Sequence, residues 1–137
     1  MTFTAFPATM TAAGLLGLLL LILAGFCLRA RFRLQQHSDR PPELREKLDR
    51  SMRVMSNFAE YVPLCLILIA LLEQARAAPL LPFGLAGLLV FGRVAHAWGL
   101  TRHAGTSTGR LLGTLATLTC LGVASVASLW IALLAGR

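Results

Sequence analysis

Polar side chains in two parts of the chain have types and spacing suited to holding an anion. Four of them follow one another at intervals of three, four and three residues: Arg50, Arg53, Asn57 and Glu60. On an α-helix, where successive residues are about 100° apart, all four fall within an arc of about 80° and form one stripe. Arg93 and His96 lie three residues apart and share a helical face in the same way.

The net charge of this set favours ligand binding over a purely structural ion-pair cluster. With Arg110 included, the set holds four arginines and one glutamate, a net charge of +3 when His96 is neutral. A cluster that only stabilises the fold would be closer to neutral. Excess positive charge in a partly desolvated site therefore indicates an anionic ligand, held by charge-assisted and partly bidentate hydrogen bonds.

Simpler interpretations of the same residues remain open. The arginines of the stripe can extend to lipid headgroups while their carbon stems stay in the membrane. Asn57 can hydrogen-bond between helices, and His96 can lie at the membrane interface. The strongest of these alternatives is that Glu60 pairs only with Arg93 and stabilises the assembly.

The composition places these residues in a membrane protein. The chain has 137 residues, of which 56% are hydrophobic and only 14% are charged, and its mean hydropathy is +0.70. A soluble domain usually has about 25% charged residues, and a disordered chain is far less hydrophobic. The apolar residues form four stretches, each near the ~20 residues that a membrane-spanning helix needs: residues 6–28, 54–72, 80–100 and 111–134. We therefore expect an all-α integral membrane four-helix bundle that forms a single membrane domain, residues 1–137.

The second span is informative because polar residues lie inside it. Its uninterrupted apolar run, Tyr61–Leu72, has 12 residues and is too short to cross a bilayer. The helix must therefore include residues 54–60, which bring Asn57 and Glu60 into the membrane. An acid at the centre of a span costs about 2.5–3.5 kcal/mol and normally faces protein or water. Glu60 is thus expected to have a partner.

The basic residues predict the orientation of the spans. Eight of the 13 Lys and Arg residues lie between Arg29 and Arg53, and the third loop holds Arg102 and Arg110. The positive-inside rule places loop 29–53 and the third loop in the cytoplasm and both termini outside. The polar residues of the second and third spans then share one depth near the cytoplasmic face. Because the basic cluster flanks a span, the net charge of +7 indicates lipid headgroups and no nucleic acid partner.

Loop 29–53 is expected to be partly helical. Pro41-Pro42 should end any continuation of the first helix, and residues 43–53 are interpreted as an extension of the second. Two pairs at i,i+4 spacing would stabilise this extension: Glu43 with Lys47 and Glu46 with Arg50. The three cysteines stand alone in apolar runs, so neither a metal site nor a disulfide framework is expected.

The residues of the second span resemble a known family signature. The pattern Arg50-x-x-Arg53-x-x-x-Asn57-x-x-Glu60-Tyr61-x-Pro63-Leu64 is similar to the second-helix signature of the MAPEG family (membrane-associated proteins in eicosanoid and glutathione metabolism). Its spacing resembles that of the cysteinyl-leukotriene synthase branch. Arg93-x-x-His96 resembles the third helix of the microsomal prostaglandin E synthase branch. The four spans, the long basic first loop and Arg110 at the start of the fourth span also fit, so the resemblance covers nearly the whole chain.

The resemblance implies a homotrimer that binds glutathione as a co-substrate between neighbouring subunits, near the cytoplasmic face and without a metal. Carried over, four residues of the second span would hold the tripeptide: Arg53, Asn57, Glu60 and Tyr61. Two residues of the third span would line the site: Arg93 and His96. Arg50 would assist from the start of its helix, and Arg110 would stabilise the glutathione thiolate. Arg29 or Arg31 would also contact the ligand.

Departures from the family pattern bear on the substrate and on the thiolate. Leu100 stands where eukaryotic synthases have a tyrosine, one turn past His96, and Ser56 replaces an arginine of the prostaglandin branch. These changes argue against eicosanoid synthesis. The third loop is slightly longer than in those enzymes, so either Arg110 or Arg102 faces the thiolate.

The residues and the resemblance together predict a glutathione transferase or peroxidase in the membrane. Only a thiolate is an effective nucleophile, and an arginine beside the sulfur favours that anion. A hydrophobic electrophile or lipid peroxide would arrive from the membrane lipid, as in detoxification. The short chain, rich in Arg, Ala and Leu, suggests a bacterial-type member in an inner membrane.

Two other functions are weighed against this prediction. The first is a non-catalytic lipid-binding or scaffold protein of the same fold. The second is a small four-span transporter, whose membrane-embedded carboxylate would be expected in the first span. Residues 1–28 carry no charged side chain, which disfavours transport.

Overall fold

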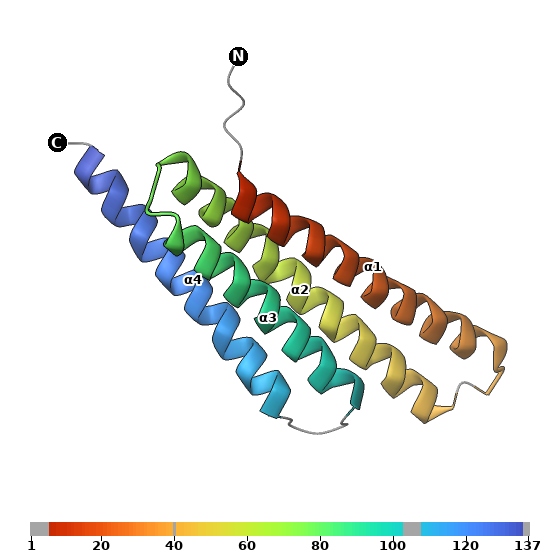
Figure 1. Ribbon diagram of the computed structural model, residues 1–137. Helices are drawn as coiled ribbons and strands as arrows, with labels where there is room; N and C mark the ends of the chain where they lie inside the picture. Colours follow the sequence, from red (N-terminus) through yellow and green to blue (C-terminus); the bar gives the residue numbers. More distant parts are fainter. Residues whose placement is uncertain (1–5, 40, 103–107, 136–137) are drawn as a thin grey trace, which may run out of the picture.

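The structure is a computed structural model of the chain, and it describes residues 6–39, 41–102 and 108–135. This part of the chain forms four α-helices, drawn in Figure 1: α1 (Pro7–Gln36), α2 (Pro42–Gln74), α3 (Leu80–Arg102) and α4 (Thr108–Ala135). Each helix is long and apolar enough to cross a membrane. The predicted all-α membrane bundle is therefore confirmed.

Successive helices run in opposite directions along the bundle (Figure 1). The start of α1, the connection from α2 to α3 and the end of α4 lie together at one end, called here the terminal end. The end of α1, the start of α2, the end of α3 and the start of α4 lie at the opposite end, called the loop end. Helix α3 contacts each of the other three, whereas α1 and α4 make no contact with each other in the described part of the chain.

Large apolar side chains cover the outer faces of α1 and α4, where a soluble protein would carry polar groups. The exposed ones include Leu15, Leu18, Leu21 and Ile22 on α1 and Val126, Leu129, Trp130 and Leu133 on α4. A soluble monomer rarely exposes contiguous apolar surface on this scale. These faces therefore suit contact with lipid.

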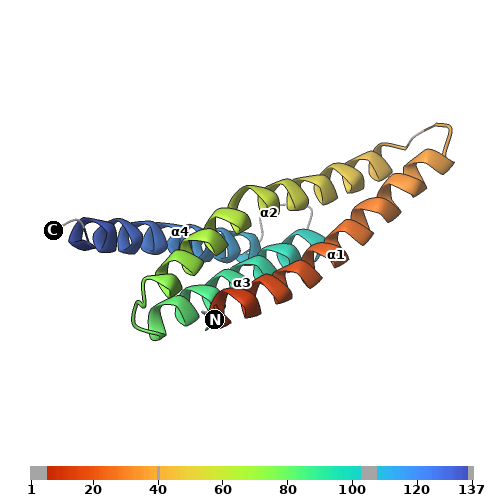
Figure 2. The same ribbon diagram turned by 90° about the horizontal axis from the view of Figure 1, so that it is seen from above.

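Helices α1 and α2 are longer than their apolar stretches and project beyond α3 and α4 at the loop end (Figures 1 and 2). Helix α1 continues to Gln36 and ends before Pro41. Helix α2 begins at Pro42, so the predicted helical extension of residues 43–53 is confirmed. At a rise of 1.5 Å per residue, the 33 residues of α2 span about 50 Å, well beyond the ~30 Å of membrane hydrocarbon.

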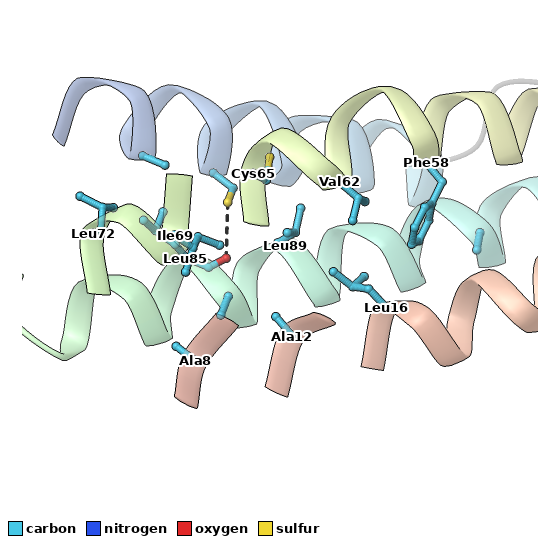
Figure 3. Close-up of a cluster of buried hydrophobic side chains, with 14 of the residues drawn as sticks. Ala8, Ala12, Leu16, Phe58, Val62, Cys65, Ile69, Leu72, Leu85 and Leu89 are labelled. Atoms are coloured by element: carbon cyan, nitrogen blue, oxygen red, sulfur yellow. Dashed lines mark hydrogen bonds between the residues drawn. The ribbon is translucent and has the colours of Figure 1, made fainter. Parts of the chain in front are cut away.

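The core lies where α2 and α3 meet α1 and α4. Helix α2 buries one side chain every three or four residues, as a helix with a single apolar face does: Val54, Phe58, Val62, Cys65, Ile69 and Leu72. Figure 3 shows the last five of these side chains beside Ala8 and Ala12 of α1 and Leu85 and Leu89 of α3. The small alanines let α1 approach closely at the terminal end. Burial of this stripe fixes the rotation of α2 about its axis.

A carboxylate of α2 caps the start of α1 at the terminal end. Oε1 of Glu73 accepts a hydrogen bond from the backbone N–H of Ala8 at 2.9 Å. Oε2 accepts one from the N–H of Thr9 at 2.9 Å and one from the Thr9 hydroxyl at 2.6 Å. The N-cap residue of α1, Phe6, has no side chain that could do this. Glu73 thus satisfies two of the free N–H groups of the first turn and places a negative charge at the positive end of α1.

Helices α3 and α4 are packed backbone to backbone at the level of Arg93. A Cβ added at Gly113 would lie 2.5 Å from the carbonyl oxygen of Gly92 and 2.6 Å from the backbone nitrogen of His96. One turn earlier, a Cβ at Gly109 would lie 3.1 Å from the carbonyl oxygen of Ala95. Small residues spaced four apart are the usual means of such close approach in membranes. This contact fixes the position of the polar residues of α3.

Candidate functional site

The rotation of α2 divides the predicted stripe into two sets. Val54, Phe58 and Val62 define the buried face. At about 100° per residue, Asn57 lies about 60° from Val54, at the edge of that face, and is half-buried. Glu60 lies about 120° from Val54 on the outer side and is exposed, as is Arg53. Tyr61 lies on the inner edge with Asn57 and is also half-buried.

Asn57 receives the side chain of Arg93 from α3. Nη2 of Arg93 donates to Oδ1 of Asn57 at 2.8 Å, and Nη1 donates to its backbone carbonyl at 3.2 Å. The sequence predicted that these two helices contribute to one site, and here their polar residues meet directly. Within one protomer Glu60 does not pair with Arg93, because Arg93 is bound to Asn57 and Glu60 is exposed.

Arg93 is a buried cation with no acidic partner among the residues that the structure describes. Its side chain is 3% exposed, and among the described residues no carboxylate forms an ion pair with it. The amide and carbonyl oxygens of Asn57 supply only dipoles. A charge inside a membrane protein is costly when its countercharge is missing, and such a residue normally marks a functional site. An anion held close to Arg93 or Asn57 would lower this cost.

His96 and Arg110 extend the polar site along α3 and α4. His96 is buried, and its Nδ1 lies 3.3 Å from the hydroxyl oxygen of Thr114 on α4. Arg110, in the first turn of α4, is half-buried and lies beside His96. Thr117 is buried one turn past Gly113, and its hydroxyl donates to the Gly113 carbonyl at 2.8 Å. The sequence did not predict that Thr114 and Thr117 belong to this site, because a single threonine in an apolar span has no distinctive spacing.

Inside the protomer, the space beside Arg93 is small. A cavity of about 10 Å³ lies between α2, α3 and α4, lined mainly by polar side chains: Asn57, Tyr61, Arg93, Thr114, Thr117 and Leu118. This volume holds about one water molecule. A ligand of tripeptide size does not fit this cavity.

The outer face of α2 carries a depression of about 500 Å³. All its lining residues belong to α2: Asp49, Met52, Arg53, Ser56, Asn57 and Glu60. Small-molecule sites usually measure about 300–1,000 Å³ and enclose most of the ligand. This depression has the volume but only one wall. Asn57 is the one residue that lines both the depression and the inner cavity.

Arg50 does not join the other site residues. Its Nη2 lies 2.6 Å from Oε1 of Glu46, which is one of the two predicted i,i+4 pairs. The other pair is not formed, because Glu43 and Lys47 make no ion pair in the described ranges. Arg50 lines a crevice between α1 and α2, together with Arg29. Arg50 therefore lines this crevice and not the depression that holds Arg53 and Glu60.

Some of the predicted positions lie outside this description. The side chains of Leu100 and Arg102 are not among those described, so the choice between Arg102 and Arg110 at the thiolate stays a prediction. Arg31 is exposed on α1 and lines neither the crevice nor the depression. Within the described residues, no group of three or more His, Cys, Asp or Glu side chains could hold a metal ion.

The fold and the site define a class: a four-helix membrane protein with a polar depression on the outer face of α2 and a buried arginine of α3 behind it. A model of the MAPEG family matches residues 9–130. The chain belongs to the MAPEG family. No curated protein and no solved structure gives a match.

Proposed function

We propose that this protein binds glutathione and uses its thiolate to attack hydrophobic electrophiles or peroxides in the membrane, as a glutathione transferase or peroxidase. The observation that carries the proposal is the buried guanidinium of Arg93, which is bound to Asn57 and has no acidic partner in the described part of the chain. Asn57 connects this buried charge to the outer face of α2. Membership of the MAPEG family supports the same ligand.

Glutathione would lie in the depression on α2. Its two carboxylates suit the guanidinium of Arg53 and the positive potential of Arg93 behind Asn57, through charge-assisted hydrogen bonds. Its free ammonium group suits the carboxylate of Glu60, which is exposed and has no ion pair among the described residues. Tyr61 would contact the tripeptide from the inner edge. His96 would line the site from α3.

A second wall is needed, and we propose that another copy of the chain supplies it. All the side chains that line the depression come from one helix, so a ligand bound to a single protomer would remain largely open. Arg53 and Glu60 are exposed although they lie beside an apolar span. In a homotrimer, each α2 would face a neighbouring subunit, and the ligand would be enclosed between the two.

The chemistry that follows is simple. The thiol of bound glutathione releases its proton, and the guanidinium of Arg110 stabilises the resulting thiolate. The thiolate attacks an electrophilic carbon and expels a leaving group such as halide. With a hydroperoxide it attacks the terminal oxygen, which breaks the O–O bond and gives glutathione sulfenic acid and an alkoxide that takes up a proton to become the alcohol. A second glutathione then converts the sulfenic acid to glutathione disulfide and water. The apolar outer faces of the helices let a hydrophobic substrate arrive through the lipid, which would place the protein in a detoxification role. The density of arginines at the loop end predicts that the site lies on the cytoplasmic side.

The proposal can be tested by titrating the purified protein in detergent with glutathione in a calorimeter. Arg53→Ala and Glu60→Ala should each weaken binding at least tenfold, because each removes a charge-assisted contact of about 1.5–3 kcal/mol. Arg45→Ala is the matched control, since Arg45 is an exposed arginine of α2 that lines neither the depression nor the crevice. The same samples are then assayed for conjugation of an aryl halide and for reduction of a hydroperoxide.

Binding that Arg53→Ala and Glu60→Ala abolish and Arg45→Ala retains, together with turnover, would support the proposal. Binding without turnover of either substrate would favour the non-catalytic alternative. Absence of glutathione binding by the wild-type protein would overturn the proposal. Native mass spectrometry of the wild-type protein tests the trimer separately.

A further inference from the structure

A second, larger cavity lies between α1 and α2 at the loop end. It measures about 640 Å³ and is lined by the last turns of α1 and the first turns of α2: Phe26, Arg29, Ala30, Arg33, Glu43, Glu46, Lys47, Arg50, Ser51 and Val54. On α2 these residues centre about 120° from those of the depression, so the two sites occupy different faces of the helix. This crevice has walls from two helices of one protomer and needs no second copy to form.

The crevice is positively charged. Of its four basic residues, Arg50 is paired with Glu46 at 2.6 Å. In the described ranges, no ion pair involves Arg29, Arg33 or Lys47. The single acid left unpaired is Glu43, so an uncompensated positive charge remains. Arg29 and Arg33 lie one turn apart on α1 and face Lys47 across the crevice.

The crevice is also amphipathic along the membrane normal. Its inner part is formed by Phe26, Ala30 and Val54, where the uncharged stretch of α1 ends. Its outer part carries the charges, beginning with Arg29. Below Phe26, the exposed face of α1 is apolar and includes Leu18 and Ile22. A ligand that fits would carry an anionic head and an apolar tail pointing into the bilayer.

We infer that this crevice is a binding site for an anionic membrane phospholipid. The phosphate would lie between Arg29, Arg33 and Lys47, and an acyl chain would pass Phe26 and follow the apolar face of α1. Basic pockets between transmembrane helices are suited to such headgroups, and each basic residue near the surface contributes about 1 kcal/mol. The depression on α2 is on another face. The variant used below leaves Arg29 and Arg50 unchanged, because the resemblance implies that Arg50 and either Arg29 or Arg31 contact glutathione.

The test uses the full-length protein in nanodiscs that contain equal amounts of phosphatidylglycerol and phosphatidylethanolamine with the same acyl chains. Retained lipids are then counted by native mass spectrometry after transfer to detergent. The double variant Arg33→Gln/Lys47→Gln removes two crevice cations, and retention of phosphatidylglycerol should fall about 30-fold. The matched control Arg31→Gln/Arg45→Gln removes two exposed charges from the same helices outside the crevice, and retention should stay within twofold.

Three results would overturn the inference. The first is equal retention of phosphatidylethanolamine and phosphatidylglycerol by the wild-type protein. The second is an equal loss of phosphatidylglycerol in both double variants, which would show general surface attraction. The third is displacement of the lipid by inorganic phosphate at equal concentration, which would assign the crevice to a soluble anion. Glutathione titration of the Arg33→Gln/Lys47→Gln variant is a separate measurement, so failure here and failure of the proposed function are distinguishable.

Discussion

The two helix pairs, α3–α4 and α1–α2, are packed differently at the loop end of the bundle. Between α3 and α4 the backbones touch, and a methyl group at Gly113 would lie 2.5 Å from the Gly92 carbonyl oxygen. Between α1 and α2 the loop end holds a cavity of about 640 Å³ with charged walls. The α1–α2 pair is joined instead at the terminal end, where Glu73 caps α1.

The α3–α4 pair therefore holds its side chains in fixed positions, whereas the α1–α2 pair leaves room for its side chains to adapt. Arg93 and His96 sit on the α3–α4 pair, so their positions are set by close contact of glycine backbones. Six of the ten residues that line the α1–α2 crevice carry long charged side chains, and five of those six are exposed. Electrostatic stabilisation of a developing charge depends on groups held in place beforehand. The rigid pair thus suits the proposed chemistry, and the open pair suits a ligand of variable shape such as a lipid.

The largest expected effect comes from breaking the rigid pair. Gly113→Ala should destabilise the protein by about 3 kcal/mol, because the added methyl group meets backbone atoms of α3 that cannot move aside. Unfolding by titration with dodecyl sulfate, followed by circular dichroism, measures this change. Gly122→Ala on the same helix is the control, since nothing lies within 4 Å of a Cβ there. Equal stability of the two variants would contradict the close contact.

The next effect tests the Glu73 cap, which connects α2 to the start of α1. Glu73→Gln should cost about 2 kcal/mol, because the charge at the start of α1 is lost and the amide offers only one acceptor oxygen. Hydrogen exchange at the amides of Ala8 and Thr9 should become faster. Gln74→Ala, at the next and exposed position, should change stability by less than about 0.5 kcal/mol. Unchanged exchange at Ala8 and Thr9 would contradict their hydrogen bonds to Glu73.

A smaller effect is expected from the hydrogen bond between Arg93 of α3 and Asn57 of α2. Asn57→Ala and Arg93→Gln, combined in a double-mutant cycle, should show a coupling energy of about 1.5 kcal/mol, since the bond between the two side chains involves a charged donor. The readout is the free energy of unfolding in mixed micelles. A cycle between Glu60→Ala and Arg93→Gln is the control and should show coupling near zero. Strong coupling there would restore the rejected Glu60–Arg93 pair.

The smallest effect is expected from the ion pair in the open crevice. Arg50→Gln should lower stability by no more than about 0.5 kcal/mol, because the Glu46 side chain is 65% exposed and the pair is spaced i,i+4. The change should shrink further in high salt. A loss above 1 kcal/mol in the same unfolding assay would mean that the crevice wall is stiffer than described.

The sequence alone predicted the four helices, because apolar stretches of about 20 residues leave few alternatives in a membrane. It also predicted that α2 and α3 bring their polar residues together. It placed Arg50, Arg53, Asn57 and Glu60 in one arc of about 80° but could not say which edge of that arc faces inward. That choice depends on the burial of Val54 and Phe58 against α1, α3 and α4.

Other features could not be predicted for different physical reasons. The Glu73 carboxylate binds Ala8 and Thr9, which precede it by 65 and 64 positions in the sequence. No local pattern predicts a partner so far away. The close contact at Gly113 depends on where α3 lies, whereas Gly122 on the same helix has open space around it. Helix α1 runs past Leu28 to Gln36, because arginine, leucine and glutamine are good helix formers even outside the membrane.

The Glu73 cap also has a consequence for the order of events during biosynthesis. The first turn of α1 leaves the ribosome long before Glu73 exists, so α1 enters the membrane with its first N–H groups still unpaired by the chain. Only when the last turn of α2 has been made and lies beside it can the carboxylate complete those bonds. We therefore expect the contact between Glu73 and Ala8 to align α1 with α2 first. Helix α3, which packs on both, would reach its final position afterwards.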